Sequence, residues 1–203
     1  EAGLTVSCDL NFRNKLWKWN SRYSSKELAR IEMPKILRHV DMIIGNEQDA
    51  DDVLDIELAD ANFEEGSIKT KEYPKIADQI NEKFPNINFI AITLRESISA
   101  NHNRWGAMIY NCENKLSYFS PKKQNTYCPF EITDIVDRLG AGDSFAAALI
   151  FSMNHLKLDY KDALDFAVAA SCIAHSIKGD YNITTVDEVR NLADGFTSGR
   201  VIR

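Results

Sequence analysis

The segment Phe89–Leu94 limits the fold more than any other feature, because it is a short run of residues that is apolar on both faces. Strands of this kind lie in the middle of parallel sheets, whose two faces are both covered by helices. Further short apolar runs occupy residues 4–10, 42–45 and 132–136, and longer amphipathic stretches separate them. This alternation predicts an α/β fold with a mostly parallel sheet.

Capping boxes and periodic stretches locate the helices. The boxes Ser24–Glu27 and Thr185–Glu188 predict two helix starts. The clearest helical patterns run over residues 142–155 and 161–178. Pro34 falls inside the first predicted helix and should bend or split it.

Two further segments complete the expected organisation. Residues 107–110 and 116–119 flank a short polar turn, which predicts a hairpin at the edge of the sheet. Residues 57–73 are the most polar and least periodic stretch, and we expect a surface loop there.

Composition excludes several classes of partner. The chain has 203 residues and a net charge of −6. Proteins that bind the phosphate backbone of nucleic acids carry clustered Lys and Arg in excess, so we expect no nucleic-acid partner. No apolar run approaches the roughly 20 residues needed to cross a bilayer, so we expect no membrane partner. The four cysteines form no C-x-x-C pair, which indicates neither a zinc site nor a disulfide framework. We therefore expect reduced thiols and a cytoplasmic location.

Residues 137–143, Asp-Arg-Leu-Gly-Ala-Gly-Asp, carry the strongest chemical signal. They follow a predicted strand and open a predicted helix, where glycine N–H groups and the helix dipole attract an anion. The carboxylate of Asp143 would repel a bound phosphate, but it suits a base that takes a proton from a substrate hydroxyl. The N–H groups would then hold the oxygens of the transferring phosphoryl group. The alternative is a glycine-rich turn in which Asp143 only caps the helix.

With this motif the chain resembles the ribokinase-like (PfkB) sugar kinase family, whose signature near the C-terminus is D-T-x-G-A-G-D. Arg138 stands where Thr is usual, a departure that is familiar among the 2-keto-3-deoxygluconate kinases. The resemblance implies a three-layer α/β/α fold, ATP and Mg²⁺ as cofactors, and Asp143 as the base. It also places Asp137 near a monovalent cation such as K⁺. It assigns the anion hole for the γ-phosphate to three consecutive residues, Gly140, Ala141 and Gly142.

The segment Asp9–Arg13 indicates what kind of sugar would accept the phosphoryl group. It ends the first predicted strand and matches the D-x-N-x-R pattern of the keto-deoxy acid kinases. Asn11 offers a donor and an acceptor to sugar hydroxyls, and Arg13 offers a planar fork that suits a carboxylate. The expected substrate is therefore a small sugar acid, unless Arg13 is an ordinary surface residue. The resemblance also places Asp180 near the sugar hydroxyls.

Asn46–Asp49 falls where the family has N-x-x-E, a motif associated with magnesium and phosphate. Asp49 replaces the usual Glu, and the resemblance implies that it orients Mg²⁺ through water. The alternative is that Asn46 simply caps a helix.

The remaining nucleotide contacts are also implied by the resemblance. Residues 93–97 are expected as a turn after the central strand, with Thr93 and Arg95 on the ATP phosphates. Alternatively, Arg95 pairs with Glu96 in solvent. The adenine is assigned to Ala170, Ala174 and His175. A lone His on a helix is otherwise a packing or surface residue.

The resemblance covers nearly all 203 residues but only the C-terminal part of a single kinase domain. The family's N-terminal strands and β-sheet lid have no counterpart, so we expect the chain alone to be a poor catalyst and the complete protein to be a homo-oligomer. The leading hypothesis is phosphorylation of 2-keto-3-deoxygluconate to its 6-phosphate.

Three alternatives stay open. One is a kinase for ribose, fructose or a nucleoside, against which Arg13 argues because a neutral sugar gives a guanidinium no partner. Another is a non-catalytic nucleotide-binding fragment. The third, a dinucleotide-binding domain, is weakened by the late position and the spacing of the glycines.

Overall fold

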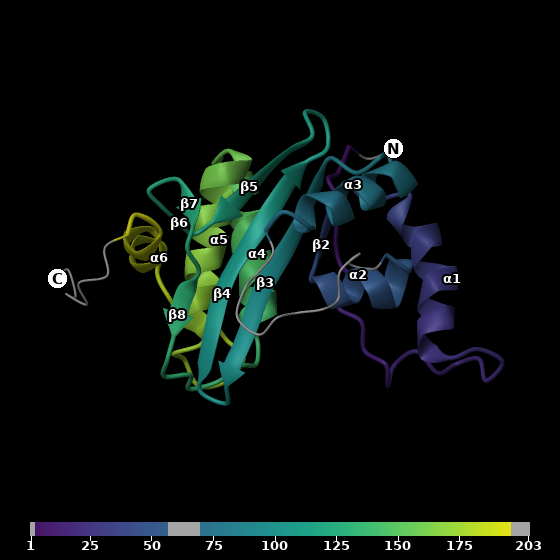
Figure 1. The fold of residues 1–203 in the computed structure, drawn as a ribbon, viewed down its shortest axis with the longest axis horizontal. Helices are drawn as coiled ribbons and strands as arrows, with labels where there is room; N and C mark the ends of the chain where they lie inside the picture. Colours follow the sequence, from purple (N-terminus) through teal and green to yellow (C-terminus); the bar gives the residue numbers. More distant parts are fainter. Residues whose placement is uncertain (1–2, 57–69, 196–203) are drawn as a thin grey trace. The chain divides into compact units, whose positions relative to one another are not determined.

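Within the described residues, strands and helices alternate in the N-terminal half of the chain, a run of strands follows, and a run of helices comes last (Figure 1). The structure is a computed structural model that describes residues 3–56 and 70–195. The strands are β1 (Ser7–Asp9), β2 (Met42–Gly45), β3 (Phe89–Ser99), β4 (His102–Asn111), β5 (Leu116–Ser120), β6 (Lys122–Lys123), β7 (Thr126–Tyr127) and β8 (Phe130–Ile132). The helices are α1 (Ser25–Leu37), α2 (Glu47–Leu54), α3 (Tyr73–Lys83), α4 (Ala141–Asn154), α5 (Tyr160–Ala174) and α6 (Val186–Ala193).

The sheet is mixed. Strands β1, β2 and β3 are parallel, with Cys8 opposite Ile43 and Ile43 opposite Ile90, which confirms the predicted parallel core. The order continues through β4 to β5, and β8 pairs with β4 in the antiparallel direction. Strand β5 ends the order, so the predicted edge hairpin is confirmed.

The chain divides into two compact units, and both β3 and β4 contribute to each of them. Unit 1 contains residues 1–94 and 108–118, and unit 2 contains residues 95–107 and 119–203.

In unit 1, α1, α2 and α3 bury their apolar stripes. Leu37, Val53 and Ile80 are almost completely buried. Helix α1 begins at its predicted capping box, in which Ser24 Oγ accepts from the N–H of Glu27. Pro34 lies within α1, and the helix continues through it to Leu37, so Pro34 does not split the helix and the predicted alternative of a bend stays a prediction.

In unit 2, α4 and α5 run side by side (Figure 1). Phe145 and Leu149 of α4, and Leu164 of α5, are completely buried. Both helices were expected, but α5 ends at Ala174 and not near residue 178. Gly179, in the loop beyond the helix end, has a φ of 90°, which lies in the left-handed region that favours glycine.

Two predicted boundaries are wrong because distant partners decide them. The expected turn at residues 93–97 is part of β3, which continues to Ser99 as a strand with mostly exposed side chains. The expected strand over residues 132–136 ends at Ile132. The N–H groups of Val136 and Asp137 donate instead to the carbonyl oxygen of His175, at 2.9 and 3.3 Å.

Three further sequence-based predictions concern the cysteines, the polar loop and membrane crossing. All four cysteines are free, as expected. Most of the predicted loop, residues 57–69, lies outside the described residues. Among the described helices, none combines the length and apolar character that a membrane crossing requires.

Candidate active site

The first turn of α4 lacks a side-chain cap. Its N-cap residue is Gly140, which has a φ of 74° and no side chain to bond the N–H groups of the first turn. In contrast, α1, α2, α5 and α6 are each capped by a Ser, Asn, Asp or Thr oxygen. The N–H groups at the start of α4 are therefore available to an anion. Asp143 lies in this turn and is exposed to solvent.

Gly140 packs directly against the backbone of Asp180. A Cβ atom at position 140 would lie 2.5 Å from the carbonyl oxygen of Asp180, a distance that no side chain tolerates. The backbone at Gly140 is also in the left-handed region, which favours glycine. The fold thus brings the predicted anion-binding turn against the predicted sugar-binding residue Asp180, which is exposed.

The carboxylate of Asp137 connects the loop that precedes α4 with the loop at Gly179. Its Oδ1 accepts from the N–H groups of Arg138 and Leu139 at 2.7 and 3.0 Å, and its Oδ2 accepts from the N–H of Gly179 at 3.0 Å. Hydrogen bonds from Leu139 and Gly179, with a smaller contribution from the charge of Lys178, lower the pKa of Asp137. A carboxylate has about four lone-pair sites, and three N–H groups bind here, so the predicted cation contact stays a prediction.

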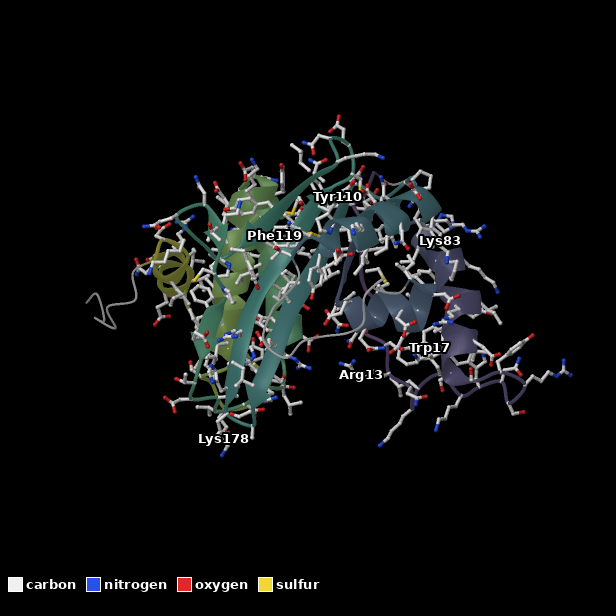
Figure 2. All side chains as sticks on the ribbon, in the orientation of Figure 1. Arg13, Trp17, Lys83, Tyr110, Phe119 and Lys178 are labelled. Carbon is white, nitrogen blue, oxygen red and sulfur yellow. The ribbon has the colours of Figure 1, made fainter. Side chains whose placement is uncertain are left out.

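Arg138 ties this loop to the turn between β3 and β4. Its Nη2 donates to the carbonyl oxygens of Ser99 and Ala100, at 2.8 and 2.6 Å. Lys178 lies at the same end of unit 2 (Figure 2). The Arg that departs from the usual family pattern therefore has a structural partner in this chain.

Residues at the C-terminal end of α5 pack against the motif at residues 137–143. Ser171 Oγ donates to the carbonyl oxygen of Ala141 at 2.6 Å, and both residues are buried. His175 is 2% exposed; its Nδ1 lies 2.8 Å from the carbonyl oxygen of Ser171 and its ring meets Trp105 edge to face. Burial lowers the pKa of His175.

The residues assigned to adenine are all part of this packed region. Ala170, Ala174 and His175 are each less than a tenth exposed. This favours the packing role that the sequence left open for His175, and the adenine assignment stays a prediction.

Asn182 is a residue that sequence reasoning missed. Its Nδ2 donates to Ser144 Oγ at 2.7 Å and to the carbonyl oxygen of Ala170 at 3.1 Å. Its Oδ1 accepts from the N–H and the hydroxyl of Thr184. No local pattern signals this role, because both partners of Nδ2 are distant in sequence.

The residues predicted to bind the sugar substrate follow β1 and lie in unit 1. Asn11 is exposed and has a φ of 36°, and Arg13 is exposed with Nη1 donating to the carbonyl oxygen of Phe12. Figure 2 labels Arg13 in the segment between β1 and α1. The N–H of Phe12 donates to Asp49 Oδ1 at 3.0 Å, so the segments after β1 and β2 lie together as the parallel core predicts.

Asn46 and Asp49 form a capping box at the start of α2, which is the alternative that the sequence left open. Asn46 Oδ1 accepts from the N–H of Asp49, and Asp49 Oδ2 accepts from the N–H of Asn46. Burial raises the pKa of Asp49, although hydrogen bonds from Phe12 and Asn46 oppose the shift.

Both carboxylate oxygens of Asp49 thus bind backbone N–H groups, and the side chain is buried. It fits a magnesium-orienting role poorly, and that assignment stays a prediction. Within residues 3–56 and 70–195, no three acidic, His or Cys side chains gather to hold a metal ion.

Thr93 and Arg95 lie on β3 and belong to different units. In unit 1, Thr93 Oγ1 donates to the carbonyl oxygen of Gly45 at 3.3 Å. In unit 2, Arg95 is exposed, and Glu96 pairs with Arg104 at 3.3 Å. The predicted alternative of an Arg95–Glu96 pair is therefore wrong, because neighbouring strand residues point to opposite faces. The contacts of Thr93 and Arg95 with ATP stay predictions.

Comparison with known proteins places this motif in a family. Residues 106–186 match the profile of the pfkB family carbohydrate kinases. The similarity to the pfkB family is therefore shown for this segment. The segment contains Gly140–Asp143 and Asn182, and the suspected family resemblance is confirmed.

Two known kinases match the chain far beyond that segment. The chain is 25% identical over 199 residues to the 2-dehydro-3-deoxygalactonokinase of Haloferax volcanii, covering 98% of this chain and 50% of the relative. It is 40% identical to the 2-dehydro-3-deoxygluconokinase of Thermotoga maritima, whose crystal structure matches with a TM-score of 0.78 over 95% of this chain and 51% of that one.

A PfkB family carbohydrate kinase from Listeria grayi matches with 24% identity and a TM-score of 0.73, over 95% of this chain and 51% of that one. These structures confirm the ribokinase-like α/β fold expected from the sequence. The chain spans about half the length of the relatives that it matches.

Proposed function

We propose that the chain is part of an ATP-dependent carbohydrate kinase that phosphorylates a 2-keto-3-deoxy sugar acid, with 2-keto-3-deoxygluconate as the leading candidate. The observation that carries this proposal is the start of α4, where an uncapped helix terminus and the exposed carboxylate of Asp143 share one turn. The match to pfkB carbohydrate kinases and to two kinases named for 2-dehydro-3-deoxy sugars supports it.

Each part of this turn has a role in the proposed reaction. Asp143 accepts the proton of a primary hydroxyl, the hydroxyl oxygen forms a bond to the γ-phosphorus, and the bond to the β-phosphate oxygen breaks to release ADP. The N–H groups of Gly140–Gly142 hold the phosphoryl oxygens and stabilise the charge that develops on them. Mg²⁺ bound to ATP would neutralise phosphate charge.

The acceptor proposal rests on unit 1. Arg13 offers an exposed guanidinium and Asn11 an exposed amide after β1. A carboxylate in the substrate matches the guanidinium, and a charge-assisted bond of that kind contributes about 1.5–3 kcal/mol.

A phosphorylation assay on the natural protein that contains this chain tests the proposal. The acceptors are 2-keto-3-deoxygluconate, 2-keto-3-deoxygalactonate, ribose and fructose, each with ATP. We expect turnover with the sugar acids, and we expect Arg13→Ala to raise their KM about 10- to 100-fold while the KM for ATP stays unchanged.

Lys15→Ala is the matched control, because Lys15 is an exposed cation two residues away. Preference for the neutral sugars would contradict the sugar-acid proposal and support the alternative of a ribose- or fructose-type kinase. Equal effects of Arg13→Ala on both substrates would contradict carboxylate recognition.

A further inference from the structure

We propose that Asn182 is a positioning residue that fixes the first turn of α4, and with it Asp143, through a hydrogen bond to Ser144. This inference rests on the proposed function and adds a residue to it. It starts from two contacts: Asn182 Nδ2 lies 2.7 Å from Ser144 Oγ and 3.1 Å from the carbonyl oxygen of Ala170. One amide group therefore joins the start of α4 to the last turns of α5.

Asn182 is the anchor of its loop. Its neighbours Tyr181 and Ile183 are 79% and 73% exposed, so burial of adjacent side chains does not hold the segment in place. The loop is held instead by the half-buried amide of Asn182, whose Oδ1 also accepts from Thr184. An amide supplies two N–H donors and an acceptor in one plane, a combination that neither Asp nor an apolar side chain offers.

Ser144 connects Asn182 to the first turn of α4, which carries Asp143. It directly follows Asp143, it is buried, and its N–H donates to the carbonyl oxygen of Gly140 at 2.7 Å. Every helix makes this first backbone bond, but Gly140 offers no side-chain cap, so the bond from Asn182 to Ser144 Oγ is the added contact at the start of α4. Ser171 adds a second link by donating to the carbonyl oxygen of Ala141.

The arrangement leaves the N–H groups of the turn unused. A conventional cap would occupy one of them with a side-chain oxygen. Asn182 acts on the hydroxyl of Ser144 instead, so it orders the turn while the N–H groups of Gly140–Gly142 stay available to a phosphoryl group. A small displacement of such a turn matters, since misplacement by about 1 Å lowers rates by about 100-fold.

Hydrogen–deuterium exchange on the 203-residue chain tests the contact without requiring activity. The variants are Asn182→Ala, Ser144→Ala and the double substitution. We expect amides of Ser144 to Ala147 to exchange about 5- to 10-fold faster in each single variant. Ala forms helix better than Ser, so faster exchange in Ser144→Ala is not an effect of helix propensity.

Asp159→Ala is the matched control. It removes the side-chain cap of α5 at the far end of that helix, about 20 Å along its axis from Ala174. We expect it to destabilise the chain without a selective effect on the start of α4.

Kinetics on the natural protein test the consequence for catalysis. We expect both single substitutions to lower kcat about 10- to 100-fold with the KM for ATP unchanged, and the double variant to be no worse than the more severe single one. Asp159→Ala should leave kcat within about two-fold.

Three results would overturn the inference: unchanged exchange at the start of α4 in Asn182→Ala, additive effects of the two substitutions, or a fall in kcat no larger than that of Asp159→Ala. If the unsubstituted protein transfers no phosphoryl group to any acceptor, the proposed function fails together with the catalytic part of this inference. The exchange data would then still confirm or contradict the contact itself.

Discussion

Asp143 lies in the first turn of α4, whose N-cap residue Gly140 makes no side-chain hydrogen bond to the N–H groups of that turn. We predict that Asp143→Asn lowers phosphoryl transfer about 10²- to 10⁴-fold and leaves ATP affinity nearly unchanged, because the amide is near-isosteric but accepts no proton. Turnover and calorimetric ATP titration of the natural protein measure the two effects.

Asp134→Asn is the charge-matched control for this prediction. Asp134 is exposed in the loop that precedes the motif, so its substitution should leave turnover unchanged. Near-normal turnover in Asp143→Asn would contradict the base assignment and leave Asp143 with a structural role.

At the scale of a single element, the C-terminal turn of α5 contains a titratable group that the fold keeps neutral. His175 is buried against Trp105, and burial, with smaller contributions from Arg138 and Arg95, lowers its pKa below the ordinary 6.5. The unfolded chain therefore takes up a proton near pH 6.5 that the folded chain resists.

We predict that the free energy of unfolding decreases as the pH falls from about 7 to about 5, and that His175→Phe makes this dependence weaker. Phe keeps a ring against Trp105 but does not titrate. Urea titrations at a series of pH values measure the slope. An identical slope in the variant and the unsubstituted chain would show that other groups cause the dependence.

Strand β4 carries a second unusual side chain. Asn103 is completely buried, and neither atom of its amide has a hydrogen-bond partner within the described part of the chain. An unpaired buried polar group costs about 1–3 kcal/mol. We predict that Asn103→Leu, which has a similar volume, raises the free energy of unfolding by about 1 kcal/mol.

Thermal and urea unfolding of Asn103→Leu check this prediction. Asn103→Ala is the comparison, because it removes the amide but leaves a cavity and should not stabilise. A loss of stability in Asn103→Leu would show that the amide has a partner such as internal water.

At the scale of the whole chain, β3 and β4 contribute residues to both compact units. Because β3 and β4 each run from one unit into the other, we predict that the units unfold in one cooperative transition. Leu37→Ala, in the core of unit 1, should cost about 2–5 kcal/mol and should also lower the unfolding midpoint of unit 2.

Tryptophan fluorescence reports on the units separately. Trp105 is the only tryptophan in unit 2, so a Trp17→Phe/Trp19→Phe background reports on that unit alone. A Trp105 transition that does not move when Leu37 is replaced would show that the units unfold independently.

Sequence-based prediction was accurate where local interactions determine the structure and inaccurate where distant ones do. Local signals were reliable: the capping boxes at Ser24 and Thr185 and the parallel core around Phe89–Leu94 are all present. Boundaries that depend on distant partners were not predictable, since Val136 bonds to His175 and not to a neighbouring strand.

The candidate site shows the same division. The helix start at Gly140–Asp143 was predictable because these residues are consecutive in sequence, and anion binding there stays a prediction. The helix cap by Asn46 was visible as an alternative because it is local, whereas the bond of Asp49 to Phe12 was not predictable because it joins residues 37 positions apart. Asn182 was missed because its partners lie 12 and 38 positions away.

The backbone contact between Gly140 and Asp180 has a consequence for protein engineering. Since position 140 admits no Cβ and the loop at 180 rests on it, insertions or deletions in residues 176–181 would shift the turn that carries Asp143. Libraries that change the length of that loop would therefore disturb the proposed catalytic turn as well as the proposed acceptor site. The segment Asn11–Arg13 belongs to unit 1 and not to this loop, and it is the better place to begin diversification.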